Sequence, residues 1–157
     1  MKFSKWLFYM TILSALSGCV YLGPPFKVND QFTSVPLDKQ VVVGITHVIL
    51  NGNSDSNRKF WDNTNRVVES LPDHKGYLGH KLRKKLFVND AWTMTIWEND
   101  DALNQFVRGD QHRQAMANGL PAVKSAQFLR LSLPRSQTPI DWSTVQQLMK
   151  DKGRDLY

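Results

Sequence analysis

The most constraining feature of this 157-residue chain is the order of strand-like and helix-like hydrophobic spacing between residues 40 and 133. The segment QVVVGITHVIL (40–50) is rich in β-branched residues and alternates, which predicts a buried strand. From Asn57 the apolar residues recur at helical spacing, and Pro72 ends this predicted helix. The ordered region therefore opens with a strand followed by a helix.

The second half of this region repeats the pattern with one extra strand. Two alternating segments, residues 77–88 and 91–98, are separated by a short polar turn and predict a hairpin. The next stretch is helical but is interrupted at Gly109, with Asp110 placed to cap a second short helix. Residues 126–133 predict a final strand.

The resulting order is β-α-β-β-α-β, which predicts an α+β fold of the ferredoxin-like class. In this fold four antiparallel strands carry two helices on one face of the sheet. The other face also bears many apolar residues, and a second sheet is its natural cover. The pattern therefore predicts a homodimer whose sheets pack face to face.

The segment TIWENDDALNQFVRGDQHRQAM (95–116) resembles the stretch shared by dimeric α/β-barrel proteins of the antibiotic-biosynthesis-monooxygenase type. In both, a strand ends in Trp-Glu, an acidic start opens a helix with Ala-Leu and an aromatic residue, and a short histidine-bearing helix follows a break. With the strand order, the resemblance covers residues 40–133. It implies a pocket between the sheet and the helices. The superfamily contains cofactor-free oxygenases of quinols and phenolic polyketides, haem-degrading enzymes, and members with no known activity.

The resemblance argues against haem degradation. Haem-degrading members carry an Asn on the first strand, a Trp in the long helix and an axial His one short helix later. The matching positions here hold Thr46 and His47, then Phe106, then Met116. His112 lies one turn before Met116, which leaves haem binding through it open. For the oxygenase interpretation no cofactor is expected.

Two histidines are candidate catalytic residues. His112 lies on the short helix where the resemblance places a pocket-lining histidine. His47 shares an apolar strand face, so we expect it to be shielded from water. A neutral imidazole at either position would serve as a base toward a phenolic hydroxyl, or would have the structural role of donating to a backbone carbonyl.

Three further residues are candidates for ligand binding. Trp97 matches the family's Trp-Glu and would stack on an aromatic ligand or simply fill the core. The orientations of His80 and Arg130 depend on strand register. No metal site is expected, because His74 and His80 have no carboxylate or cysteine at ligand spacing.

The N-terminus has the pattern of a signal peptide. Lys2 and Lys5 precede an apolar run that is too short to span a bilayer. The following Leu-Ser-Gly-Cys, which ends at Cys19, resembles the bacterial lipobox. The resemblance implies cleavage before Cys19 and a diacylglycerol on its thiol, so that the membrane is a partner. The alternative is a signal anchor with a chance cysteine.

Sorting and domain organisation follow from the same pattern. An Asp directly after the cysteine would favour retention in the inner membrane. This chain has Val20 at that position, which implies an outer-membrane lipoprotein facing the periplasm of the cell envelope. The predicted domains are a signal peptide (1–18), a lipidated Cys and tether (19–38), a dimeric α/β-barrel domain (39–133), and a C-terminal tail (134–157) with a short helix capped by Ser143.

Two functions compete on this basis. The first is a membrane-anchored lipoprotein with a monooxygenase-like domain that oxidises a quinol or phenolic small molecule without a cofactor. The second is a non-catalytic dimeric module for ligand binding or envelope interaction. The formal charge of +6, which becomes +4 without residues 1–18, is spread along the chain and is too weak to indicate nucleic-acid binding.

Overall fold

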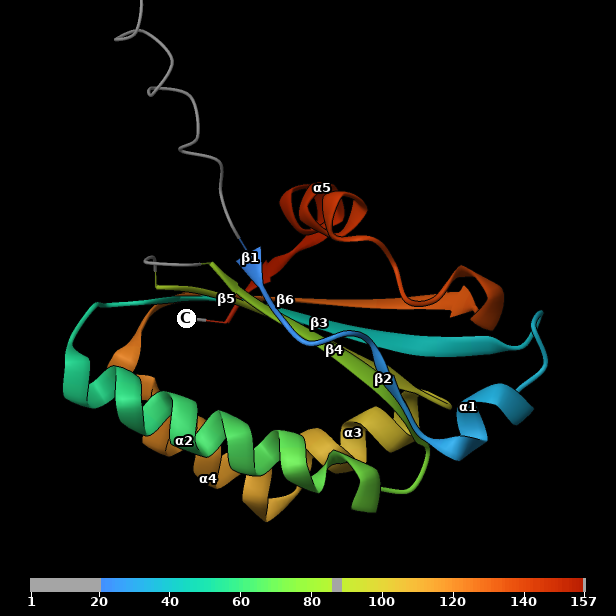
Figure 1. The fold of residues 1–157 in the computed structure, drawn as a ribbon, viewed down its shortest axis with the longest axis horizontal. Helices are drawn as coiled ribbons and strands as arrows, with labels where there is room; N and C mark the ends of the chain where they lie inside the picture. The colour runs from blue at the N-terminus through green and yellow to red at the C-terminus, as the bar shows by residue number, and fades with distance from the viewer. Residues whose placement is uncertain (1–20, 86–88, 157) are drawn as a thin grey trace, which may run out of the picture.

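The computed structural model describes residues 21–85 and 89–156 and has an antiparallel sheet at its centre (Figure 1). The four main strands lie in the order β4-β5-β3-β6, which is the ferredoxin-like order predicted from the sequence. Their bounds are β3 (Gln40–Leu50), β4 (Tyr77–Lys85), β5 (Asp90–Trp97) and β6 (Val123–Pro134). The predicted fold class is confirmed.

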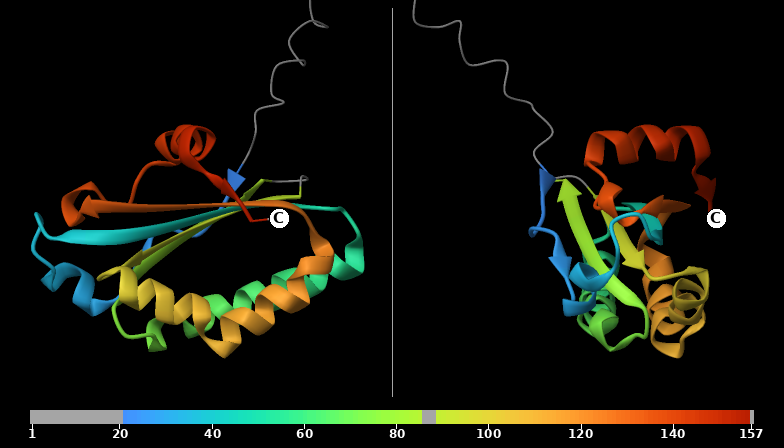
Figure 2. Two further views of the ribbon diagram at one scale, coloured as in Figure 1. Left: turned by 180° about the vertical axis from the view of Figure 1, so that it is seen from behind. Right: turned by 90° about the vertical axis from the view of Figure 1, so that its right-hand side faces the viewer.

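Three helices lie on one face of this sheet (Figures 1 and 2). They are α2 (Ser54–Ser70), α3 (Asp100–Arg108) and α4 (Asp110–Gly119). The predicted break at Gly109 is present: its extended backbone separates α3 from α4, and Asp110 lies in the first turn of α4 rather than capping it. The side chains of Asn53 and Asn99 cap α2 and α3 by accepting hydrogen bonds from backbone N–H groups.

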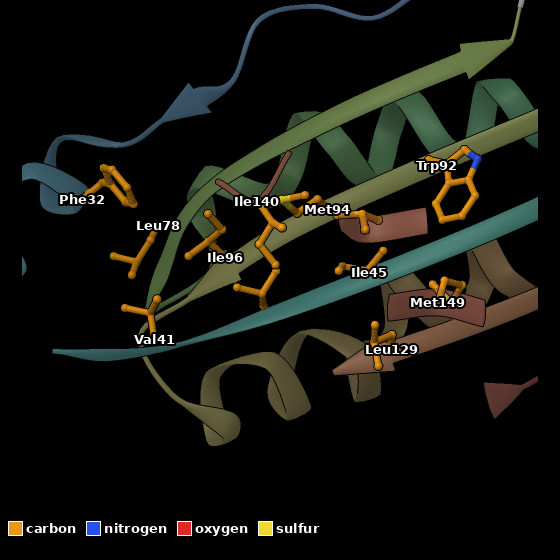
Figure 3. Packing of buried hydrophobic residues seen from close by; sticks show 12 residues of the cluster. Phe32, Val41, Ile45, Leu78, Trp92, Met94, Ile96, Leu129, Ile140 and Met149 are labelled. Atoms are coloured by element: carbon orange, nitrogen blue, oxygen red, sulfur yellow. The ribbon is translucent and has the colours of Figure 1, made fainter. Parts of the chain in front are cut away.

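The opposite face of the sheet is covered by the same chain. Helix α5 (Trp142–Lys152) and the short helix α1 (Asp30–Ser34) lie there, and Figure 3 shows Met149 of α5 close to the sheet residues Ile45 and Leu129. The sequence predicted a second sheet as the cover of this face. The difference arises because the C-terminal segment supplies Val145 and Met149, both buried, as an apolar helix face.

The edges of the sheet are extended by short strands. β1 (Tyr21–Leu22) and β2 (Lys27–Val28) pair with β4, and β7 (Arg154–Asp155) pairs with β6. Residues 21–34 fall within the predicted tether, yet they lie against the domain. Short 3-10 helices of one turn each lie between the longer elements, at Leu71–Asp73, Leu120–Ala122 and Arg135–Gln137.

One buried cation links the first described strand and the C-terminal helix to the sheet. The guanidinium of Arg83, on β4, is 4.0 Å from the ring centroid of Tyr21 and 4.5 Å from that of Trp142. Cation–π contacts of this kind attract most strongly away from water, and Arg83 is only 9% exposed. The cap of α5 also differs from prediction: Asp141, not Ser143, accepts from the N–H groups of Ser143 and Thr144.

None of the helices in the described ranges is both long enough and apolar enough to cross a membrane. The predicted signal peptide and Cys19 lie outside the described residues.

Candidate functional site

A cavity of about 770 Å³ lies between the sheet and the helices α2, α3 and α4. Its floor is formed by sheet residues with small side chains, which are Gly44, Thr46, Ala91, Thr93, Thr95 and Ala126. These residues occupy neighbouring positions in the register of β3, β5 and β6. Small side chains on one sheet face leave room below the helix layer, and this is the local origin of the cavity.

Helix α2 forms much of the roof. It has 17 residues, yet none of them is fully buried. Its apolar face points at the sheet through Phe60, Trp61, Val67 and Val68, and all four side chains line the cavity. An amphipathic helix normally buries this stripe in the core. Here the stripe borders an open space, which is the arrangement expected of a ligand pocket.

The lining is apolar and aromatic, and its charged groups are all basic. Among the described residues that line the cavity none is Asp or Glu, whereas Lys27, Lys84 and Arg130 all contribute. Arg130 is paired with Asp100 at 2.9 Å and also donates to the side chain of Asn104. The ammonium group of Lys84 lies 5.4 Å from the ring centroid of Trp61.

His112, which the resemblance singled out, lines the cavity. Its Nδ1 lies 3.2 Å from the backbone carbonyl oxygen of Val107 and donates to it, because a carbonyl can only accept. In the neutral ring this leaves Nε2 with its lone pair. Burial lowers the pKa of His112, so the ring is neutral at pH 7 and Nε2 is able to accept a proton.

His80 also lines the cavity, and it is backed by a buried tyrosine. The Tyr77 hydroxyl lies 2.5 Å from Nδ1 of His80, whereas Nε2 of His80 is buried with no hydrogen-bond partner among the described residues. Burial raises the pKa of Tyr77 to about 12, so the phenol keeps its proton. Its hydroxyl has no other hydrogen-bond partner among the described residues, so donating to Nδ1 leaves fewer polar groups unpaired than accepting would. The proton of a neutral His80 then resides on Nε2. Burial and the charge of Lys27 lower the pKa of His80.

His47 does not line this cavity, which corrects the expectation that it faces a ligand there. It lies on the α5 side of the sheet, where its Nε2 is 3.1 Å from an oxygen of Asp90 and its ring stacks on Trp92 at 3.8 Å. The alternation of β3 decides this: Gly44 and Thr46 face the cavity, so His47 faces away from it.

Trp97 is also placed differently from its predicted role. Its side chain is fully buried in the core below α3, against Tyr77 and Phe106, and does not line the cavity. The expected aromatic wall is supplied by Phe60, Trp61 and Phe106 instead. Of the predicted site residues, the structure therefore brings His80, His112 and Arg130 together around one cavity.

Sequence reasoning missed Tyr77 and Lys27. The strand β4 contains a bulge between Tyr77 and Gly79, which puts Tyr77 and His80 on the same face although they are three residues apart. Lys27 is opposite His80 in the β2–β4 ladder, and directly paired residues project from the same face. The Gly79 beside His80 was the available signal, because glycine within a strand often marks a bulge or a close backbone approach.

Comparison with known proteins bears on the fold. No family model and no curated protein matches this chain. Among solved structures, the chain is similar to SnoaB, a cofactor-independent oxygenase from Streptomyces nogalater, with 14% identity and a TM-score of 0.52 over 65% of this chain and 99% of that one. A candidate monooxygenase from Lactobacillus acidophilus has 15% identity and a TM-score of 0.49, over 62% of this chain and 48% of that one. A dimeric ferredoxin-like protein from Thermobifida fusca has 13% identity and a TM-score of 0.49, over 63% of this chain and 96% of that one.

At these identities the similarity establishes the fold and nothing finer. The chain spans about half the length of the Lactobacillus protein. SnoaB is matched over nearly its whole length, and the matched part of this chain carries the common architecture. This chain therefore has a ferredoxin-like α+β fold, which it shares with SnoaB over 65% of its length.

Proposed function

We propose that this chain is a lipid-anchored envelope protein whose cavity binds a quinol or phenolic small molecule and oxidises it with O2 without a cofactor. The observation that carries the proposal is the aromatic-lined cavity of about 770 Å³ with the unprotonated Nε2 of His112 in its wall. The volume is within the range of pockets that enclose a small organic ligand.

The chemistry assigns His112 the role of general base. Nε2 takes the phenolic proton, and the resulting electron-rich anion transfers an electron to O2. Recombination places one oxygen atom on the ring and the other leaves as water, so that a quinol and O2 give a hydroxyquinone and water. The apolar lining would exclude bulk water from the radical pair.

Membrane attachment through Cys19 is part of the same proposal. The described domain begins at Tyr21, and residues Leu22 to Pro24 line the cavity. A lipid on Cys19 would therefore hold one side of the cavity close to the bilayer, from which an apolar substrate would enter. The proposal is tested by mass spectrometry of the mature N-terminus, where a Cys19→Ser variant should lose the acyl mass and the membrane fraction.

A homodimer also stays within the proposal, but we expect its interface to differ from the face-to-face sheet packing predicted from the sequence. The α5-side residues Val43 and Ile45 have no exposed surface in the single chain. A second sheet would therefore have to displace α5 to reach them. We expect a dimer to use another face, and multi-angle light scattering of the purified protein measures its mass.

The deciding experiment is O2 uptake by the mature protein in detergent with a panel of hydroquinones and naphthoquinols. We expect uptake above the rate of uncatalysed autoxidation, and incorporation of one labelled atom from 18O2 into the product. His112→Ala should abolish uptake, whereas the matched variant His47→Ala, outside the cavity, should retain it if it melts like the parent protein.

The second hypothesis, a non-catalytic ligand-binding module, is distinguished by the same experiment. A folded protein that retains a naphthoquinol in its cavity without consuming O2 would refute the oxygenase assignment. The aromatic lining and the absence of carboxylates among the described lining residues would serve a binder equally well.

A further inference from the structure

The part of the cavity wall formed by β2 and β4 combines three features that the proposed oxidation does not use. His80 is 5% exposed, and its Nε2 has no hydrogen-bond partner among the described residues. Lys27 is the Cα partner of His80 in the β2–β4 ladder and lines the same cavity. Tyr77 fixes the ring of His80 from behind through its hydroxyl.

The buried Nε2–H of His80 is a donor in need of an acceptor. Buried polar groups in folded proteins are almost always hydrogen-bonded, so an unpaired donor beside a cavity favours a ligand that brings an acceptor. Nε2 has almost no accessible surface, so that acceptor would reach it after a small shift of the side chains that cover it. Because Tyr77 donates to Nδ1, the fold itself places the ring proton of neutral His80 on Nε2, whether or not a ligand is bound.

Charge defines the ligand further. Lys27 is close enough to His80 to lower the pKa of that ring, and it adds a full positive charge to the same part of the wall. No carboxylate among the described lining residues offsets it. Lys27 is exposed at the rim of the cavity, so its attraction for an anion is partly screened by water and adds to the hydrogen bond from His80.

We propose that His80 and Lys27 bind the negatively charged oxygen of an aromatic ligand, a phenolate or a carboxylate, with Tyr77 as the positioning residue behind His80. This inference rests on the proposed function only in assuming that an aromatic molecule enters the cavity. For a quinol it supplies what His112 lacks: a neutral imidazole is a weak base toward a phenol, and a stabilised phenolate makes that proton transfer less unfavourable.

The test is equilibrium dialysis of the full mature protein with two probes, 2-naphthoate and 2-methylnaphthalene. The two share the aromatic body, but only the first carries an anionic oxygen. We expect His80→Phe to weaken 2-naphthoate binding by about tenfold and Lys27→Met to weaken it about threefold, with 2-methylnaphthalene binding unchanged. Lys59→Met, on the exposed surface of α2 outside the cavity, is the matched control and should alter neither.

Tyr77→Phe gives an independent readout. The 15N NMR signals of the His80 ring should report the Nε2–H tautomer in the parent protein and a tautomer mixture in the variant, with 2-naphthoate binding several-fold weaker. A purely structural role for Tyr77 would lower the melting temperature without changing the tautomer. This variant retains the ring and so keeps the test valid if His80→Phe does not fold.

The outcomes separate this inference from the proposed function. Equal losses for both probes, or no loss for 2-naphthoate, would refute the anion site while leaving the cavity as a binding site. Selective loss of 2-naphthoate binding in a protein that consumes no O2 would support the anion site and overturn the oxidation. Failure of the parent protein to bind either probe would refute both.

Discussion

The packing of α5 on the sheet can be tested through Val145, which has no exposed surface. Val145→Ala removes two buried methyl groups, each worth about 0.8 kcal/mol, and leaves a void in the core against the sheet. With the cost of that void, we expect the free energy of unfolding to fall by about 2 to 3 kcal/mol. For a domain of this size the melting temperature should fall by roughly 4 to 12 °C.

The assay is urea unfolding followed by tryptophan fluorescence and circular dichroism, with Lys150→Ala as a control on the exposed face of the same helix. The control should change the free energy of unfolding by less than about 0.5 kcal/mol. If Val145→Ala changes it no more than the control does, α5 does not cover the sheet in solution. The α5-side face would then be available to a second sheet, as the sequence pattern alone predicted.

Three further outcomes are expected. Ala115→Phe would place a ring inside the cavity from α4, so binding of 2-methylnaphthalene should fall at least tenfold, while the melting temperature stays within a few degrees. Burial and the Lys27 charge lower the pKa of His80 below 6.5, so the unfolded chain binds more protons than the folded one as the pH falls below 6.5. The free energy of unfolding should therefore decrease over that range, by at most about 1.4 kcal/mol per pH unit. His80→Phe should remove this component of the slope, measured by urea titrations at several pH values. Asn99→Ala removes the side chain that caps α3 and should cost about 1 kcal/mol, measured by the same unfolding assay.

Element order was predictable from the sequence because each segment has a strong local signal. The strand β3 covers Gln40–Leu50, as its β-branched alternation indicated, and the helical pattern before Pro72 became α2. Gly109 interrupts the helices because its extended backbone cannot continue a helix. Because these signals are local, they predict the elements without any knowledge of the tertiary structure.

The candidate site was predictable only in part, because strand register decides which side chains meet. His112 could be placed from the helix break, but the orientation of His80 depended on the bulge in β4. Regular alternation would have put Tyr77 and His80 on opposite faces and separated the pair that now hydrogen-bonds. The residues of β3 and β5 that α5 covers lie far before it along the chain, so no local pattern could pair the two.

One face of the sheet carries the larger buried core, and the other face borders the cavity. On the α5 side, Ile45, Met94 and Met149 are buried in a contiguous core, whereas on the helix side the buried cluster around Trp97 and Leu103 is smaller and lies beside the cavity. Because that core is complete, α2 need not pack closely on the sheet, and small residues such as Gly44 and Thr46 are tolerated beneath it. A cavity of this size would otherwise carry a large packing cost. Covering one face with α5 of the same chain is therefore what permits an open, ligand-sized space on the other.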